Sequence, residues 1–132
     1  MPNEEELNRL AYEAQYLQQQ AQEMQRQLQQ AILVLNNIDA TTKTIDGLTG
    51  VKEDTFFQIG SDAFVKARPS PDMVLIDVGA NVLIEKEPKD AKELLKTRKA
   101  NMEKAVGVLQ RNLEKLNGRL LEIDRKAEEL QG

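Results

Sequence analysis

Two long runs of apolar residues with coiled-coil spacing dominate this chain of 132 residues. In the first run the steps alternate between three and four residues, which places one apolar stripe along a helix. A short β unit cannot cover so long a stripe, so the helix requires a helical partner. We therefore predict an N-terminal helix over residues 3–40. Its stripe positions are Leu7, Leu10, Ala14, Leu17, Ala21, Met24, Leu28, Ala31, Leu35 and Ile38.

The second run follows Pro88, a residue that is favoured at the first position of a helix. It predicts a C-terminal helix over residues 88–131. Arg98 interrupts the apolar stripe, and two successive steps of four residues around Met102 make one stutter. The stripe positions are Ala91, Leu95, Met102, Val106, Leu109, Leu113, Leu116, Leu120, Ile123, Ala127 and Leu130.

The two stripes match when one of them is read backwards. Each step of three or four residues along the first stripe is matched to within one residue by a step back along the second, so that Leu10 pairs with Ile123 and Ile38 with Leu95. This is the register of two antiparallel helices. The chain is therefore expected to form a long coiled-coil hairpin, with both termini at one end and the middle of the chain at the other.

The middle of the chain contains one short pattern twice, as Ile59–Lys66 and Val78–Glu85. Each copy has an apolar residue, a glycine, a small residue and then Asp62 or Asn81, followed by a β-prone run. Gly, Asp and Asn tolerate positive φ best, and two such residues between extended segments form a tight turn. The pattern predicts two tandem β-hairpins. The predicted strands cover residues 55–59, 63–68, 73–78 and 82–86, within a hairpin unit over residues 45–87.

The end of the first helix is predicted from threonines and glycines. Thr41, Thr42 and Thr44 lower the helix propensity of their segment, and Gly47 and Gly50 then break the helix. We therefore expect the helix to end near residue 40.

The predicted strands are too few and too short to be stable as an isolated open sheet, and they leave unpaired edges. The segment 69–72 contains two prolines, links the hairpins and cannot itself pair. We predict an obligate oligomer that is joined through the middle of the chain, with closure into a barrel as the arrangement that removes all edges. The expected oligomerisation residues are Phe57, Ile59, Gly60, Phe64, Val65, Val74, Ile76, Val78, Gly79, Val82 and Ile84.

The residue content excludes several classes of function. The chain has no His and no Cys, so it lacks the commonest general base, a thiolate metal site and a disulfide framework. We predict no enzyme activity, no metal site and no cofactor. The net charge of −4 argues against a nucleic-acid partner, and the apolar runs are too short to predict a membrane-spanning helix. The acidic N-terminus has no signal-peptide pattern, and the lack of Cys is compatible with the cytoplasm, where we expect the protein.

The order of helix, two β-hairpins with Gly-containing turns and helix resembles the α class of prefoldin subunits of the archaeal type. The resemblance covers nearly the whole chain. Its most specific residues are Gly60–Ala67, Val78–Asn81, Glu85-Lys86 before Asp90-Ala91, and Leu10–Leu17 near the N-terminus. It implies an α+β fold in one domain over residues 1–132, in which two tandem β-hairpins join a long antiparallel coiled coil and oligomerise into a β-barrel platform.

The same resemblance implies a function and a set of partners. The expected assembly is a hetero-hexamer of two α-class and four β-class subunits, with six coiled coils around a cavity. It is expected to capture unfolded proteins at the coiled-coil tips without ATP and to deliver them to a group II chaperonin. The tip residues expected to contact client proteins are Leu7, Leu10, Tyr12, Tyr16, Ile123, Ala127 and Leu130.

Other interpretations of these residues remain open. The stripe residues at the tip could serve only to close the coiled coil, and the two tyrosines could be incidental surface residues. The many glutamines of the first helix are typical of a solvated helix face, although they could also line a cavity. As an alternative function, the chain could be an architectural or filament-forming prefoldin-like scaffold that does not transfer clients.

Overall fold

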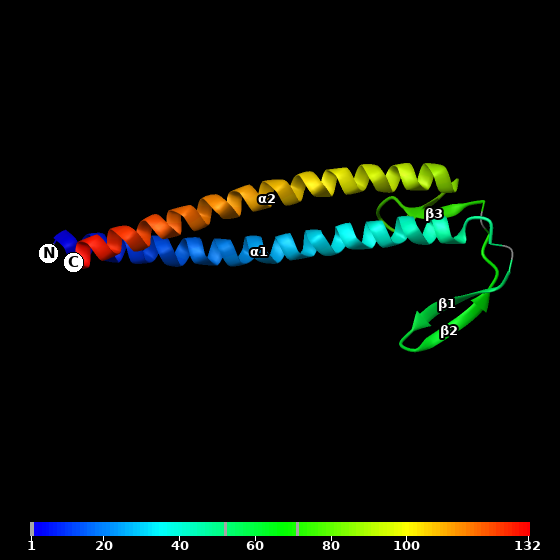
Figure 1. Cartoon of the computed structure of the whole chain (residues 1–132), viewed down its shortest axis with the longest axis horizontal. Coiled ribbons are helices and arrows are strands. Elements are labelled where there is room, and N and C mark those ends of the chain that lie inside the picture. The colour runs from blue at the N-terminus through cyan, green and yellow to red at the C-terminus, as the bar shows by residue number, and fades with distance from the viewer. Residues whose placement is uncertain (1, 52, 71) are drawn as a thin grey trace. The chain divides into compact units, whose positions relative to one another are not determined.

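The computed structural model describes residues 2–51, 53–70 and 72–132, and Pro71 of the predicted linker lies outside these residues (Figure 1). The architecture is α+β, as the sequence predicts. None of the described helices is both long and apolar enough to cross a membrane. The elements, in chain order, are α1 (Pro2–Leu48), β1 (Thr55–Gly60), β2 (Ala63–Ala67), β3 (Val74–Asp77), β4 (Leu83–Lys86) and α2 (Pro88–Gln131).

The chain divides into two compact units, which we describe separately. We call Met1–Leu35 with Asn101–Gly132 the terminal unit, and Asn36–Ala100 the hairpin unit. The terminal unit contains only the N-terminal part of α1 and the C-terminal part of α2. The hairpin unit contains the remaining helical segments and all four strands.

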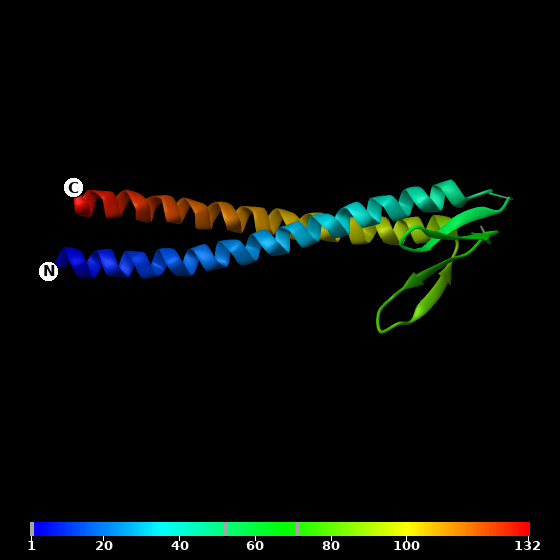
Figure 2. The ribbon, with the colours of Figure 1, turned by 90° about the horizontal axis from the view of Figure 1, so that it is seen from below.

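In the terminal unit the two helical segments lie side by side and run in opposite directions, with the N- and C-termini at the same end (Figures 1 and 2). The predicted stripe is buried or half-buried at every position of this unit. Leu10 and Ile123, which the register pairs, are the most buried of these side chains, at 2% and 3% exposure. The predicted antiparallel coiled coil is therefore confirmed.

The predicted end of the first helix at residue 40 is wrong, because α1 continues to Leu48. The hydroxyl groups of Thr41, Thr42 and Thr44 each donate a hydrogen bond to the backbone carbonyl four residues earlier, at 2.7, 3.0 and 2.8 Å. These bonds satisfy the hydroxyl groups within the helix. The continued helix also buries Ile45, which is only 7% exposed. Packing of Ile45 therefore outweighs the low helix propensity of the threonines.

The strands form two separate antiparallel hairpins, β1–β2 and β3–β4. Phe57 lies opposite Val65 in the first hairpin, and Ile76 lies opposite Ile84 in the second. The first hairpin has an irregularity between Gln58 and Gly60. The strand ends differ from the predicted ones by at most one residue, and both predicted hairpins are confirmed.

The turns of the hairpins use the positive φ that the repeated pattern predicts. Asp62 has a φ of 58° and Asn81 a φ of 62°. In the second turn Gly79 and Ala80 also have positive φ, at 117° and 51°. The Asp77 carboxylate accepts a hydrogen bond from the backbone N–H of Gly79 at 2.8 Å, which holds the start of this turn in place.

The core of the hairpin unit joins the second hairpin to the two helices. The buried side chains are Ile45 of α1, Ile76 of β3, and Ala91 and Leu95 of α2. Arg98 occupies the position where the predicted stripe is interrupted, and its guanidinium donates a hydrogen bond to the backbone carbonyl of Asp77 at 2.9 Å. The polar residue therefore serves to anchor the end of β3 rather than to pack in the stripe.

Candidate functional site: protein-binding surfaces

The predicted tip residues of the coiled coil separate into a closed seam and an exposed surface. Leu10 and Ile123 are buried, while Leu7, Ala127 and Leu130 are half-buried. These five stripe residues face the partner helix of the same chain, which is the arrangement expected of a coiled-coil seam. In this closed arrangement they offer little apolar surface to another protein.

The two tyrosines form the exposed part of the predicted tip. Tyr12 is 76% exposed and Tyr16 is 59% exposed. The amide of Gln20 donates a hydrogen bond to the Tyr16 hydroxyl at 2.8 Å, one turn further along α1. This bond restrains the Tyr16 ring on the helix surface and leaves its apolar faces accessible.

Leu121 is 63% exposed in the terminal unit and was not predicted as a tip residue. It follows Leu120, a stripe residue, and successive residues on a helix point about 100° apart. This spacing could have identified it, because a second leucine directly after a stripe leucine must lie outside the narrow seam.

An ion pair connects the two helices about one turn from Leu10 and Ile123, the most buried residues of the seam in the terminal unit. The Arg119 guanidinium donates to both carboxylate oxygens of Glu13, at 2.7 and 3.0 Å, and to Glu122 at 3.0 Å. The hydrogen bond from Arg119 lowers the pKa of the Glu13 carboxyl, and the bonds to Glu13 and Glu122 raise the pKa of Arg119. Such a bidentate hydrogen bond fixes the relative position of the two side chains, so it favours one register of the coiled coil.

The terminal unit has a second group of exposed apolar residues, which was not predicted from the sequence. Ile32, Leu33 and Val34 are 40%, 62% and 40% exposed. They lie between the stripe residues Ala31 and Leu35, so α1 is apolar on all sides over this turn. An apolar ring of this kind is unusual on a solvated helix.

The hairpins carry the second candidate surface, and the predicted oligomerisation residues lie on both of their faces. Ile76 is buried against the helices of its own chain, and Phe57, Val74 and Ile84 are half-buried. The remaining residues are exposed: Ile59, Gly60, Phe64, Val65, Val78, Gly79 and Val82.

Four further apolar residues of the hairpins are exposed and were not predicted: Phe56, Met73, Leu75 and Leu83. Phe56 and Phe64 line an apolar hollow of about 370 Å³, and the Lys66 ammonium group lies 6.0 Å from the centre of the Phe56 ring. Alternation along a strand gives two faces but does not say which one meets the helices. Both hairpins therefore present more apolar surface than the sequence indicated.

No group of three or more Asp or Glu side chains within residues 2–51, 53–70 and 72–132 is placed to hold a metal ion. Both units instead have exposed apolar side chains, which are typical of sites that bind other proteins.

Comparison with known proteins identifies the family. The family model described as "Prefoldin subunit" matches residues 17–132. The chain belongs to the prefoldin family. It is 24% identical to prefoldin subunit alpha of Methanobrevibacter smithii, over 98% of this chain and 90% of that protein. It is 29% identical to prefoldin subunit alpha of Pyrococcus horikoshii, again over 98% of this chain and 90% of that protein.

A solved structure gives the same fold. The cryo-EM structure of filamentous prefoldin from Methanocaldococcus jannaschii matches with a TM-score of 0.77 at 17% identity, over 89% of this chain and 99% of that chain. The relatives place this chain in the α class of prefoldin subunits. The family consists of chaperones rather than enzymes, and it implies a chaperone-type role within an oligomeric assembly.

Proposed function

We propose that this prefoldin subunit captures unfolded proteins at the end of its terminal unit, without ATP, and delivers them to a group II chaperonin. The observation that carries this proposal is the exposure of Tyr12, Tyr16 and Leu121 beside a seam that Leu10 and Ile123 close. The free energy falls when a client's apolar segment covers apolar side chains that the fold leaves in water.

The strength of each contact is small. Burial contributes roughly 25 cal/mol per Å² of apolar surface, so one aromatic side chain supplies only a few kcal/mol before the loss of client freedom is subtracted. Several copies that contact one client together would bind far more tightly than any one copy. Weak single contacts also allow release, which delivery to a second chaperone requires.

The proposed assembly is a cytoplasmic hetero-hexamer of two α-class and four β-class subunits, joined by a barrel of hairpins. Its support is the apolar surface of the hairpins, with Phe56, Phe64, Leu75 and Leu83 each more than half exposed. Isolated two-stranded hairpins are marginal in water, so these strands gain most from pairing with strands of other subunits.

Client capture can be tested by substituting exposed residues only, so that the seam of the coiled coil stays unchanged. In the assembled complex, replacing Tyr12, Tyr16 and Leu121 with Ser is expected to remove most of the suppression of aggregation of a chemically unfolded client, measured by light scattering. A matched triple variant replaces Ile32, Leu33 and Val108, which are also exposed in the terminal unit, and is expected to retain suppression. An equal effect of both variants, or none of either, would contradict capture at the tip.

A truncation tests the tip as a whole. Deletion of residues 1–16 and 121–132 removes the tip end of the seam from both helices together with Tyr12, Tyr16 and Leu121, and it is expected to abolish suppression while the complex keeps its mass. Loss of assembly in this variant would place residues 1–16 and 121–132 in the platform instead. Transfer is then measured as refolded client yield after addition of a group II chaperonin and ATP, and the truncated complex is expected to give no gain over chaperonin alone.

A second candidate function is architectural. The fold matches a prefoldin that forms filaments, and an exposed hairpin surface can build either a closed ring or an open fibre. Electron microscopy of the purified chain distinguishes the two. Closed particles of one size favour the chaperone complex, whereas fibres that lengthen with concentration favour the scaffold.

A further inference from the structure

A groove in the hairpin unit has no part in the proposed function. It lies between the last turns of α1 and the first turns of α2 and has a volume of about 450 Å³. Ile38 and Leu95 supply its apolar lining, and Leu95 is only 5% exposed. A volume of this size accommodates a few apolar side chains rather than a whole peptide.

The rim of this groove contains both paired and unpaired charges. Lys92 forms an ion pair with Asp46 at 2.7 Å, and Lys99 forms one with Asp39 at 2.7 Å. These two pairs join α1 to α2 across the groove. Their charges are therefore compensated within the chain.

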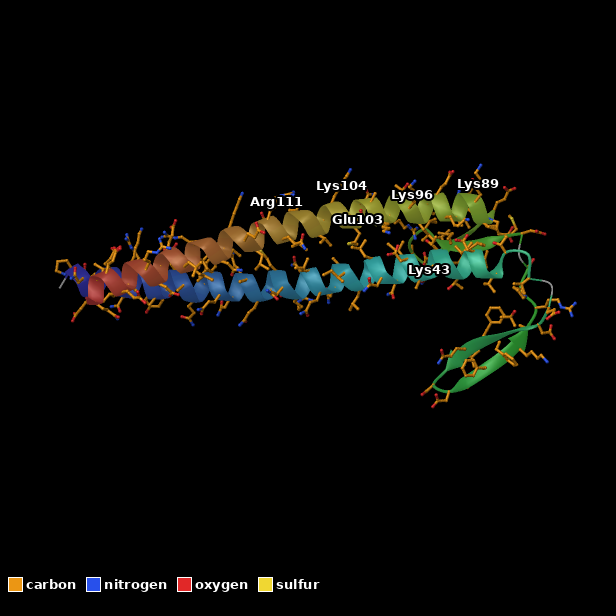
Figure 3. The ribbon with its side chains drawn as sticks, in the orientation of Figure 1. Lys43, Lys89, Lys96, Glu103, Lys104 and Arg111 are labelled. Carbon is orange, nitrogen blue, oxygen red and sulfur yellow. The ribbon has the colours of Figure 1, made fainter. Side chains whose placement is uncertain are left out.

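Lys89 and Lys96 also line the groove, but neither has a hydrogen bond or an ion pair with any residue that the structure describes. Both side chains extend from the same side of α2 in Figure 3. Lys89 lies in the first turn of α2, where the helix dipole disfavours a positive charge. An anion beside Lys89 would relieve this repulsion.

The spacing of the charges specifies the anion further. Lys89 and Lys96 are seven residues apart on α2, which separates their backbone positions by about 10.5 Å along the helix axis. Glu93 lies between them on the same side, lines the groove, and has no ion pair with a described residue. The order along the rim is therefore basic, acidic, basic, at intervals of about one helical turn.

We propose that this groove binds an acidic amphipathic helix of a partner protein. Two carboxylates that are two turns apart on that helix would pair with Lys89 and Lys96, and a basic residue between them would pair with Glu93. Apolar side chains of the same helix would fill the space beside Ile38 and Leu95. Docking of an amphipathic helix into a groove between helices is a common mode of peptide recognition.

A nucleic acid fits this groove less well than a helix does. Glu93, which has no ion pair with a described residue, lines it and would repel a phosphate backbone, and Ile38 and Leu95 offer nothing to a phosphate. A polypeptide can satisfy both the apolar and the charged parts, because it carries side chains of each kind.

The test uses the full chain in its assembled form and a fluorescein-labelled peptide of about 20 residues, long enough to form a helix. The peptide carries leucines at helical spacing and a Glu–Lys–Glu triad over two turns. A second peptide carries Lys–Glu–Lys instead. Fluorescence anisotropy at about 0.15 M salt is expected to show roughly tenfold tighter binding of the first peptide.

Charge reversal in the protein supplies the decisive comparison. Lys89→Glu with Lys96→Glu is expected to weaken the first peptide roughly tenfold and to strengthen the second. The matched control, Lys104→Glu with Arg111→Glu, makes the same change of charge elsewhere on α2 and is expected to leave binding unchanged. Circular dichroism checks that both variants keep their helices.

Several outcomes would overturn the proposal. Equal weakening by the control variant would show attraction to the net charge of α2 rather than to the groove. Unchanged binding of a peptide with serine in place of leucine would show that the apolar lining takes no part. Competition by a single-stranded oligonucleotide as strong as that of the acidic peptide would show a general anion surface. None of these outcomes affects client capture, which is measured with different residues.

Discussion

The turn between β3 and β4 places residue 80 in a backbone conformation that only glycine adopts without strain. Ala80 has a φ of 51°, and the left-handed region costs an L-residue roughly 1–2 kcal/mol. Replacing Ala80 with Gly removes this strain. It also raises the entropy of the unfolded chain, which lowers the unfolding free energy by about 0.4–1 kcal/mol. We expect a net gain in unfolding free energy of about 0.5 kcal/mol, measured by chemical denaturation followed by circular dichroism.

The neighbouring glycine provides the opposite change. Gly79 has a φ of 117°, and an added methyl group would have no atom within 4 Å, so Gly79→Ala changes the backbone alone. It is expected to destabilise the hairpin by about 1–3 kcal/mol. A loss for Ala80→Gly, or no loss for Gly79→Ala, would show that this turn differs from the one described.

The Glu13–Arg119 pair gives the coiled coil a defined dependence on pH. The hydrogen bond from Arg119 lowers the pKa of Glu13 in the folded chain below its usual value of 4.5. Stability from this pair is therefore full above pH 4.5 and is lost as the pH falls through the lowered pKa. Glu13→Gln is expected to lower the melting temperature at pH 7, with the difference from the unmodified chain vanishing in acid.

A pH-independent difference would mean that Glu13 stabilises the helices by packing rather than by charge. Glu23→Gln is the matched control. Glu23 also has a lowered pKa, through a hydrogen bond from Arg26, but this bond lies within α1 and joins no second helix. It is expected to change the melting temperature less, because exposed pairs within one helix contribute little.

At the scale of elements, β3 has two faces with different roles. Ile76 is 6% exposed and packs with Ile45, Ala91 and Leu95, whereas Leu75 is 59% exposed. Ile76→Ala is expected to cost about 2–4 kcal/mol of unfolding free energy, because it leaves a cavity between the hairpin and the helices.

Leu75→Ala is expected to leave the stability of the single chain within about 0.5 kcal/mol and to weaken assembly instead. Chemical denaturation and size-exclusion chromatography measure the two effects separately. Equal effects of the two changes on stability would mean that both faces of β3 are packed inside the chain.

The sequence predicts those elements whose cause is periodic or local. The stripe of α1 and α2 and the positive φ of Asp62 and Asn81 follow directly from residue spacing and turn chemistry. The end of α1 does not, because threonine hydroxyls and the burial of Ile45 together extend the helix. The exposed face of each hairpin also depends on tertiary contacts, since Leu75 and Ile76 are equally apolar in sequence.

The candidate tip was only partly predictable for the same reason. Tyr12 and Tyr16 lie off the stripe and are exposed as their positions suggest, whereas Leu10 and Ile123 are stripe residues and are buried. The Glu13–Arg119 pair required the structure, because it depends on which side chains of the two helices meet, whereas Leu121 could have been identified from its position directly after the stripe residue Leu120. A helical pattern specifies which residues form the seam but not which polar side chains of the two helices meet beside it.

For the whole molecule, we infer that the exposed hairpins join this subunit to others. A chain with so much apolar surface on two isolated hairpins is expected to be unstable alone in water. Replacing Phe56 and Phe64 with Ser should therefore abolish assembly while the helices remain folded, as measured by light scattering and circular dichroism. Assembly that survives this change would mean that these two residues take no part in the interface between subunits.

Native mass spectrometry of the purified chain, with and without a co-expressed β-class prefoldin subunit, measures assembly through the hairpins. We predict a single closed complex of two copies of this chain with four β-class copies, and no folded monomer in the co-expressed sample. A folded monomer as the dominant species in both samples would contradict assembly through the hairpins.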